Sequence, residues 1–187
     1  MPAPLQIALR AGQLLFAVIT LALVGNVVDE AFAGNSSSIN FALFVSILDF
    51  VFVLYGIAAI FFESLAFGFV GPSIDAVLAI FTFIAGTVLA AKLGVHSCGN
   101  QVIISPSLDN RALIANDVQK SYIRSNPLTN GSNNPGKRCH ELQAATAFYW
   151  FALPLFVTSA ALAFMGSGSS FKGRGGIRRG GPSMSQV

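Results

Sequence analysis

The sequence predicts an all-α integral membrane protein built as a bundle of four transmembrane helices. Of its 187 residues, 53% are hydrophobic and only 10% are charged, and the mean hydropathy is +0.67. Soluble domains carry about 25% charged residues. Four apolar runs, near 5–28, 40–62, 73–93 and 142–164, each reach the ~20 residues that a helix needs to cross a bilayer. We therefore expect a membrane domain over 1–164 and a disordered, basic cytosolic tail over 165–187.

The first run has an alternative interpretation as a signal peptide, because Ala31-Phe32-Ala33 resembles a cleavage site. Its apolar core is longer than the ~7–15 residues of such a peptide. Two acidic residues, Asp29 and Glu30, also precede the site. We interpret the run as the first membrane span.

The charge pattern and the glycosylation sequons predict the orientation. Arg10 lies before the core of the first run and acidic residues follow it, which favours an amino terminus inside the cell, although basic residues are nearly balanced between the two sides. Sequons at Asn35 and Asn130 fall in the two loops on the opposite side. We expect both termini in the cytosol and an extracellular loop over 94–138.

Two cysteines, Cys98 and Cys139, bracket this long polar loop. Outside the cell they are expected to pair and to join the third helix to the fourth. The alternative is two free thiols near the membrane interface. Zinc ligation with His96 and His140 lacks the spacing of known zinc sites, so we expect no metal and no cofactor other than bound lipid.

Three acidic residues mark the central pair of spans. Asp49 lies inside an apolar run, where a charge costs about 2.5–3.5 kcal/mol, so it should face the bundle interior. It serves either a proton or ion pathway or a buried hydrogen bond to a neighbouring helix or protomer. Glu63 and Asp75 flank the short link between the spans, and we expect both at the cytosolic interface, solvated or near a helix start.

Small residues and basic residues predict further contacts. Gly86 with Ala90, and Ser159 with Ala163, have the small-xxx-small spacing that lets membrane helices pack closely. Basic residues of the tail should attract anionic lipid at about 1 kcal/mol each. They are Lys172, Arg174, Arg178 and Arg179. These residues do not lie on a face that also carries aromatic side chains, so we expect no nucleic-acid binding. The sequence also contains no set of residues typical of a catalytic site.

Several motifs, in order along nearly the whole chain, resemble the fungal non-classical export protein family, which are tetraspan proteins with a MARVEL domain. They are Leu54-Tyr55-Gly56, Glu63 with Leu65-Ala66, Asp75, 81–86, His96-Ser97-Cys98, Cys139, Gln143-Ala144-Ala145 with Ala147-Phe148, and Ser185-Gln186-Val187. The resemblance implies a plasma-membrane protein of eisosome-associated furrow domains, with cytosolic termini and a link to sphingolipid status. MARVEL relatives also assemble into oligomers.

These observations predict a non-enzymatic organiser of lipid domains that binds sphingolipid or sterol and self-associates. Its expected partners are membrane lipids, further copies of itself, and eisosome or other membrane-domain proteins. One alternative is a small proton- or ion-coupled transporter or channel-like subunit that uses Asp49. Another, suggested by the family's name, is an adaptor in unconventional protein secretion.

Overall fold

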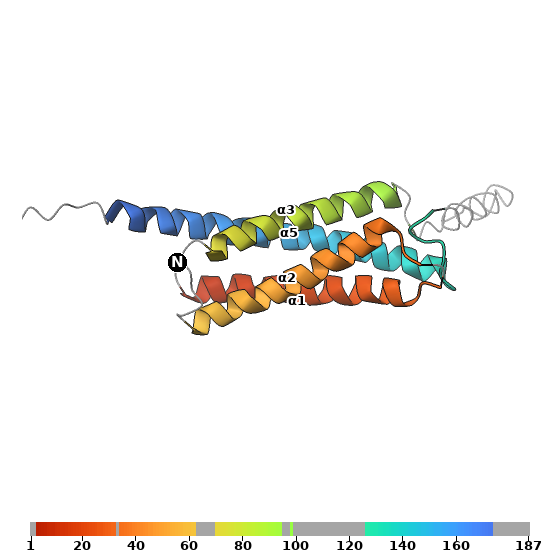
Figure 1. Cartoon of the computed structure of the whole chain (residues 1–187), viewed down its shortest axis with the longest axis horizontal. Coiled ribbons are helices and arrows are strands. Elements are labelled where there is room, and N and C mark those ends of the chain that lie inside the picture. Colours follow the sequence, from red (N-terminus) through yellow and green to blue (C-terminus); the bar gives the residue numbers. More distant parts are fainter. Residues whose placement is uncertain (1–2, 33, 63–69, 95–97, 99–125, 174–187) are drawn as a thin grey trace, which may run out of the picture.

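The computed structural model describes residues 3–32, 34–62, 70–94, 98 and 126–173, with side chains up to 165 in the last segment. This part of the chain forms four helices, α1 (Ala3–Asp29), α2 (Ser37–Phe61), α3 (Val70–Leu93) and α5 (Pro135–Gly173), shown in Figure 1. All four are long and apolar enough to cross a membrane. The predicted fold class, a four-span helical bundle, is confirmed.

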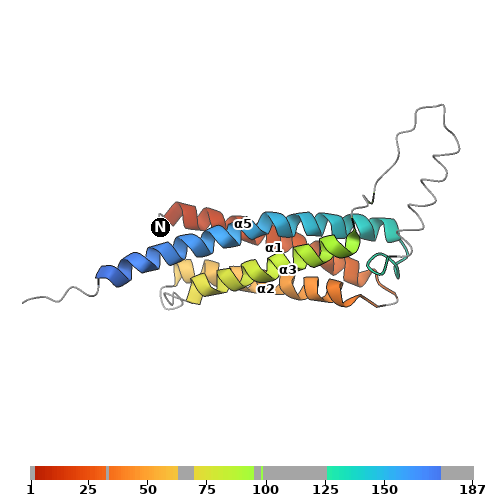
Figure 2. The ribbon, with the colours of Figure 1, turned by 90° about the horizontal axis from the view of Figure 1, so that it is seen from above.

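The helices form a ring in which α1 and α3 each contact both α2 and α5. Therefore α1 faces α3 across one diagonal, and α2 faces α5 across the other. The amino terminus lies at the same end of the bundle as the end of α2 and the start of α3, and we call this the terminal end (Figures 1 and 2). At this end α5 extends beyond the other three helices (Figure 2). The opposite end is called the disulfide end.

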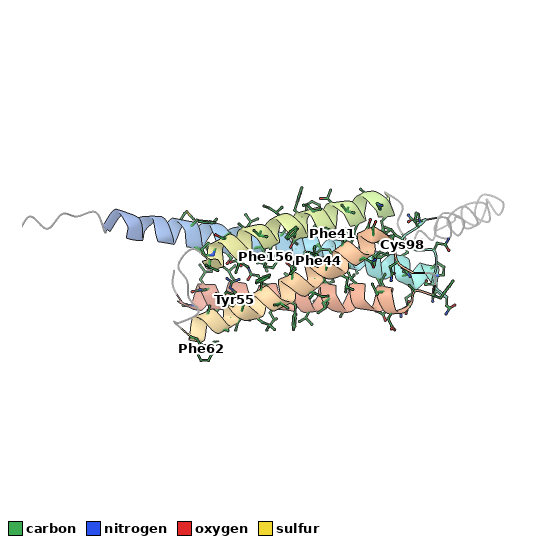
Figure 3. All side chains as sticks on the ribbon, in the orientation of Figure 1. Phe41, Phe44, Tyr55, Phe62, Cys98 and Phe156 are labelled. Carbon is green, nitrogen blue, oxygen red and sulfur yellow. A yellow bond between two sulfur atoms is a disulfide. The ribbon has the colours of Figure 1, made fainter. Side chains whose placement is uncertain are left out.

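Two apolar clusters fill the interior of the ring. One occupies the disulfide half and includes Ile39, Leu89, Leu142 and Tyr149. The other occupies the terminal half and contains Val53, Leu78, Ala79, Ala152 and Phe156. Large apolar side chains also cover the outside, among them Phe44 (Figure 3), and likewise Phe83 and Phe151. A helix that is apolar on both faces is typical of a membrane span, because lipid covers its outer face.

The fourth helix differs from its prediction at both ends. The expected span was 142–164, but α5 begins at Pro135 and ends at Gly173. The irregular loop therefore does not reach 138, and the tail predicted as disordered from 165 begins with helix. Hydropathy detects only the part of a helix that lies in hydrocarbon. A helix satisfies its own backbone hydrogen bonds and can continue past the membrane into polar sequence.

A disulfide and several hydrogen bonds hold the disulfide end together. Cys98 and Cys139 form a disulfide that joins the chain after α3 to the first turns of α5. The Asn126 side chain donates to the carbonyl of Lys92 at 3.0 Å and accepts from the Leu128 amide at 2.9 Å. The segment before α5 also contacts the chain that follows α1, because Phe32 N donates to the carbonyl of Gly131 at 3.0 Å.

Candidate functional site

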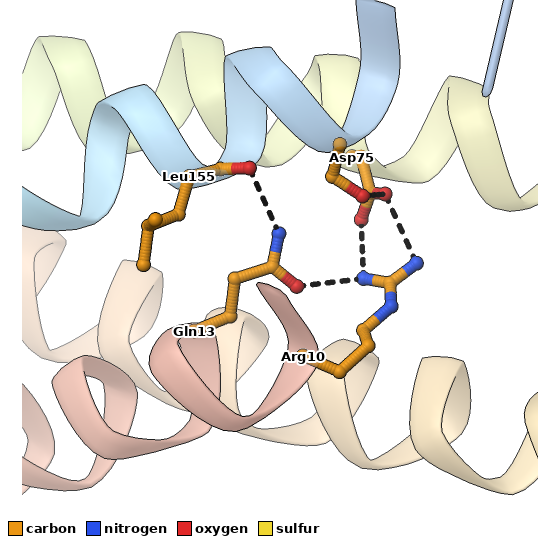
Figure 4. Close-up of polar contacts among 5 residues, drawn as sticks. Arg10, Gln13, Asp75 and Leu155 are labelled. Carbon is orange, nitrogen blue, oxygen red and sulfur yellow. Dashed lines mark hydrogen bonds and ion pairs between the residues drawn. The ribbon is translucent and has the colours of Figure 1, made fainter. Parts of the chain in front are cut away.

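An ion pair lies inside the bundle near the terminal end. Arg10 of α1 reaches across the diagonal to Asp75 of α3, with Nη1 to Oδ1 at 2.7 Å and Nη2 to Oδ2 at 3.0 Å (Figure 4). Arg10 is 8% exposed and Asp75 is 1% exposed. The two parallel bonds match the fork of the guanidinium to the carboxylate, which is the strong, orientation-specific form of this contact.

Two further polar side chains complete this cluster. Ser159 of α5 donates to Asp75 Oδ2 at 2.6 Å. Gln13, one turn after Arg10, accepts from Arg10 Nη1 at 2.9 Å and donates to the carbonyl of Leu155 at 3.2 Å (Figure 4). The cluster thus connects α1, α3 and α5. We call Arg10, Gln13, Asp75 and Ser159 the charged cluster.

The remaining helix of the ring, α2, provides the surface against which the guanidinium packs. A methyl group on Gly56 of α2 would lie 2.7 Å from Arg10 Cζ and 2.8 Å from Nε. These distances are closer than non-bonded carbon atoms approach, so the absence of a side chain at Gly56 makes room for Arg10. Arg10 Nε is buried without a hydrogen-bond partner, which is consistent with its close approach to this glycine.

The position of Asp75 corrects the sequence-based prediction. We expected Asp75 at the solvated interface or at the helix start, and Asp49 as the only deep acid. Instead Asp75 is buried, because α3 already begins at Val70 and Arg10 compensates the carboxylate. Arg10 is likewise not a free flanking charge, so it no longer supports the orientation that its position in the sequence predicted.

Asp49 lies in a second polar contact, between α2 and α3. Its carboxylate accepts from Thr82 Oγ1, at 3.2 Å to Oδ2 and 3.4 Å to Oδ1. Both residues are 1% exposed. The partner belongs to a neighbouring helix of the same chain, which is the kind of contact expected of a packing residue.

A third polar contact crosses the other diagonal. The Tyr149 hydroxyl of α5 donates to the carbonyl of Ala42 in α2 at 2.7 Å and shares a 2.6 Å hydrogen bond with Ser46. Tyr149 is 1% exposed. Each diagonal of the ring is therefore bridged by polar side chains.

Apolar side chains separate the charged cluster from Asp49. Along α2, Gly56 marks the level of the charged cluster, and Asp49 lies about 10 Å further along the helix axis at ~1.5 Å per residue. Val53, Leu78 and Phe156 occupy the intervening level and are at most 2% exposed. The described residues thus place an apolar layer between these two polar contacts.

A groove opens on the outer surface between α2 and α3. Its volume is about 370 Å³. Seven of the described lining residues are apolar and Ser73 supplies a hydroxyl; the apolar ones are Leu48, Phe52, Val70, Ile74, Val77, Leu78 and Phe81. Because the groove lies along two membrane spans, it faces hydrocarbon. We call it the α2–α3 groove.

At the disulfide end, Arg138 is fully buried and organises the polar side chains. Its Nε donates to the carbonyl of Leu128 at 2.9 Å, and its Nη2 donates to Asn35 Oδ1 at 2.6 Å. Nearby, Lys137 forms ion pairs with Glu30 and Glu141. These contacts join α1 and the start of α2 to the start of α5.

The predicted packing pairs have different environments. Gly86 is buried, and a methyl group there would lie 3.4 Å from Tyr149 and Trp150, so this glycine lets α3 approach α5. Ala90 is exposed beside a recess of about 240 Å³ that Trp150 also lines. Ser159 is a hydrogen-bond donor rather than a small spacer, and Ala163 is half-buried.

Other predicted residues lie outside the described side chains. Lys172 falls within α5, but only the course of the helix is described there. Glu63, His96, Arg174, Arg178 and Arg179 lie outside the described residues. Among the residues that are described, no group of three or more His, Cys, Asp and Glu side chains is placed to hold a metal ion.

Sequence reasoning missed the partners of the buried acids. A usable signal was present for one pair, because Arg10 and Gln13 are three residues apart in an apolar run and so share a helix face. That spacing indicates a polar position in the bundle interior. The roles of Thr82 and Tyr149 carried no comparable signal, since hydroxyl groups are common in membrane helices.

Comparison with known proteins identifies relatives over nearly the whole chain. Residues 3–162 match the family model MARVEL, described as a membrane-associating domain. The chain is 34% identical to non-classical export protein 2 of Saccharomyces cerevisiae, over 96% of this chain and 95% of that protein. It is 31% identical to non-classical export protein 102 of Candida albicans, over 97% and 96%. No solved structure is a significant match.

Proposed function

Because this chain belongs to the MARVEL family of membrane-associating domains, we propose that it is a non-enzymatic organiser of plasma-membrane lipid domains. In this role it binds sphingolipid or sterol, self-associates, and marks eisosome-type furrow membrane together with other membrane-domain proteins. The polar side chains of the bundle interior bond to one another and serve packing. The outer surface is the part that meets the membrane.

The α2–α3 groove is the observation that carries this proposal. Its volume of about 370 Å³ falls in the range of roughly 300–1,000 Å³ typical of small-molecule sites. The described lining has no charged side chain and one hydroxyl-bearing residue, Ser73. This chemistry suits the hydrocarbon of a sterol or a sphingolipid better than a charged headgroup, because a buried charge needs a partner.

The disulfide supports an orientation with both termini in the cytosol. Disulfides persist in oxidising compartments, and the Cys98–Cys139 bridge lies at the end of the bundle opposite the amino terminus (Figures 1 and 3). The disulfide end then faces the outside of the cell. This argument replaces the one from Arg10, because the charge of Arg10 is paired with Asp75 inside the bundle.

Photo-crosslinking tests the groove. The full-length protein in vesicles is exposed to a photoactivatable sterol and, separately, to a photoactivatable sphingolipid. Val77→Trp places a large ring in the groove, whereas Val157→Trp changes an equally exposed valine of α5 outside it. We expect crosslinking to at least one lipid to fall several-fold only in Val77→Trp. Equal crosslinking in both variants would contradict a groove site.

Self-association and domain organisation need their own measurements. Masses of the protein in lipid nanodiscs should exceed that of one chain, and its deletion should change the pattern of furrow domains in cells. A strictly monomeric protein whose loss leaves the domains unchanged would refute the proposed role.

A transporter that uses Asp49 is the rival function. It requires a polar route through the bundle, and the apolar layer at Val53, Leu78 and Phe156 speaks against one. Proteoliposome flux that disappears in Asp49→Asn would favour the transporter. Absence of flux would leave Asp49 as a packing residue bonded to Thr82.

The names of the relatives favour one further candidate, an adaptor in unconventional secretion. Deleting the gene and measuring export of proteins that lack signal peptides separates this role from domain organisation. Export that falls while the lipid domains stay intact would favour the adaptor.

A further inference from the structure

We propose that Asn130 carries an N-linked glycan, whereas Asn35, the other sequon asparagine, stays unmodified because its amide is part of the fold. The inference rests on the proposed orientation, in which both residues face the compartment where glycans are added. It uses the different environments of two side chains that are equivalent in the sequence.

Both polar atoms of the Asn35 side-chain amide form hydrogen bonds. Its Nδ2 donates to the carbonyl of Val28 at 3.4 Å, and its Oδ1 accepts from Arg138 Nη2 at 2.6 Å. Arg138 is 0% exposed and already has a buried Nη1 without a partner. Asn35 is half-buried, and a sugar on Nδ2 would crowd the Val28 carbonyl and the buried guanidinium that contact the amide, so it would disturb both hydrogen bonds. Loss of a partner for a buried charge costs more than loss of a neutral hydrogen bond.

Asn130 presents the opposite environment. It is exposed, its Oδ1 accepts from the Gly131 amide at 2.8 Å, and its Nδ2 donates no hydrogen bond within the described part of the chain. Gly131 has φ of +91°, a backbone conformation that turns the chain and that glycine adopts readily. A glycan on Asn130 can therefore extend into solvent without disturbing a described contact.

The burial of the Ser132 hydroxyl indicates when the glycan is transferred. Ser132 is 6% exposed and its Oγ is buried without a hydrogen-bond partner. Transfer of the glycan to Asn130 therefore precedes the packing of α5, and the finished fold then accommodates the sugar. A sugar on Asn35 would disturb the contacts of its amide, so the chains that reach the finished fold are those without it. In the reaction, Nδ2 bonds to the anomeric carbon of a lipid-linked pyrophosphate oligosaccharide, the bond from that carbon to the pyrophosphate breaks, and the Nδ2 proton leaves with the carrier.

The disulfide that supports the proposed orientation also bears on the compartment of Asn130. Cys98–Cys139 lies at the same end of the bundle as Asn130, and both modifications need the lumen of the secretory pathway.

Paired serine variants test the assignment without touching either asparagine. Ser132→Ala destroys the Asn130 sequon and removes a hydroxyl that has no partner. Ser37→Ala destroys the Asn35 sequon at an exposed position of α2. The full-length variants are expressed in a yeast host, treated with a peptide N-glycosidase, which hydrolyses the glycosylated amide, and compared by gel mobility. Mass spectrometry then locates the asparagine that enzymatic deglycosylation converts to aspartate.

We expect a mobility shift in the unchanged protein and in Ser37→Ala, and none in Ser132→Ala or Asn130→Gln. A shift that persists in Ser132→Ala, or that disappears in Ser37→Ala, overturns the assignment. Absence of a shift in the unchanged protein also overturns it. Non-reducing mass spectrometry of the cysteine peptides then tells which premise failed, because an oxidised pair preserves the orientation while free thiols remove it. The lipid crosslinking result is independent of both.

Discussion

Arg10 and Asp75 form a two-pronged ion pair between α1 and α3, two helices that are not neighbours in the ring. The bonds cross the interior of the bundle, so they set the separation of the helices on that diagonal. Tyr149 does the same for α2 and α5 through Ser46 and the carbonyl of Ala42. Polar contacts therefore define the cross-section of a bundle whose surface is apolar.

Removing one member of the ion pair should be strongly destabilising. Asp75→Asn and Arg10→Gln each leave a buried group without its charged partner, and we expect a loss of about 3–5 kcal/mol of unfolding free energy for each. The double variant should lose less than the sum of the two. Denaturant titration in mixed micelles measures these values. Asp29→Asn, at an exposed residue that ends α1, is the control, and an equal loss there would contradict the prediction.

Gly56→Ala should disturb the same cluster from the α2 side. The added methyl group would lie 2.7 Å from Arg10 Cζ, so the guanidinium or the helix has to shift. Gly25→Ala is the matched control, because a methyl group there meets nothing within 4 Å. The control should be neutral or should stabilise α1 by roughly 0.5–1 kcal/mol. The thermal unfolding midpoint should fall in Gly56→Ala and should stay the same or rise in Gly25→Ala, and equal midpoints would refute the close contact.

Tyr149→Phe removes the hydroxyl that bridges the second diagonal and keeps the ring. Hydrogen bonds between membrane helices average about 0.6 kcal/mol and reach about 1.7 kcal/mol, so we expect a loss in this range. Combining it with Ser46→Ala in a double-mutant cycle isolates the bond between the two hydroxyl groups. Strictly additive losses would show that these two side chains do not interact energetically.

Opening the disulfide should lower stability without changing the four spans. The bridged cysteines are 41 residues apart. In the chain-entropy model, closing a loop of this size contributes roughly 4 kcal/mol. We expect Cys98→Ser and chemical reduction to lower the unfolding midpoint to the same extent, while circular dichroism keeps its helical signal. If reduction leaves the midpoint of the native protein unchanged, the bridge does not restrain the unfolded chain.

How well the sequence predicts a feature of this protein depends on whether that feature needs a partner from another helix. The length of an apolar run predicts a span because the run has to match the thickness of the hydrocarbon, whichever helices it packs against. The ends of α5 at Pro135 and Gly173 were missed because a helix also continues in polar surroundings. Asp75 was assigned to the interface because it lies near the start of a span. Its partner Arg10 is 65 residues away in the chain, so no local pattern indicated the ion pair.

The sequence by itself determined the membrane class, the four helices and the residues that are costly in lipid, since these depend on composition and on local periodicity. Only the tertiary structure decided how those residues are satisfied. The rotation and tilt of each helix place Arg10 against Asp75, Thr82 against Asp49, and Arg138 against Asn35. Such partners lie on different helices, and no local pattern in the chain specifies which helix faces meet.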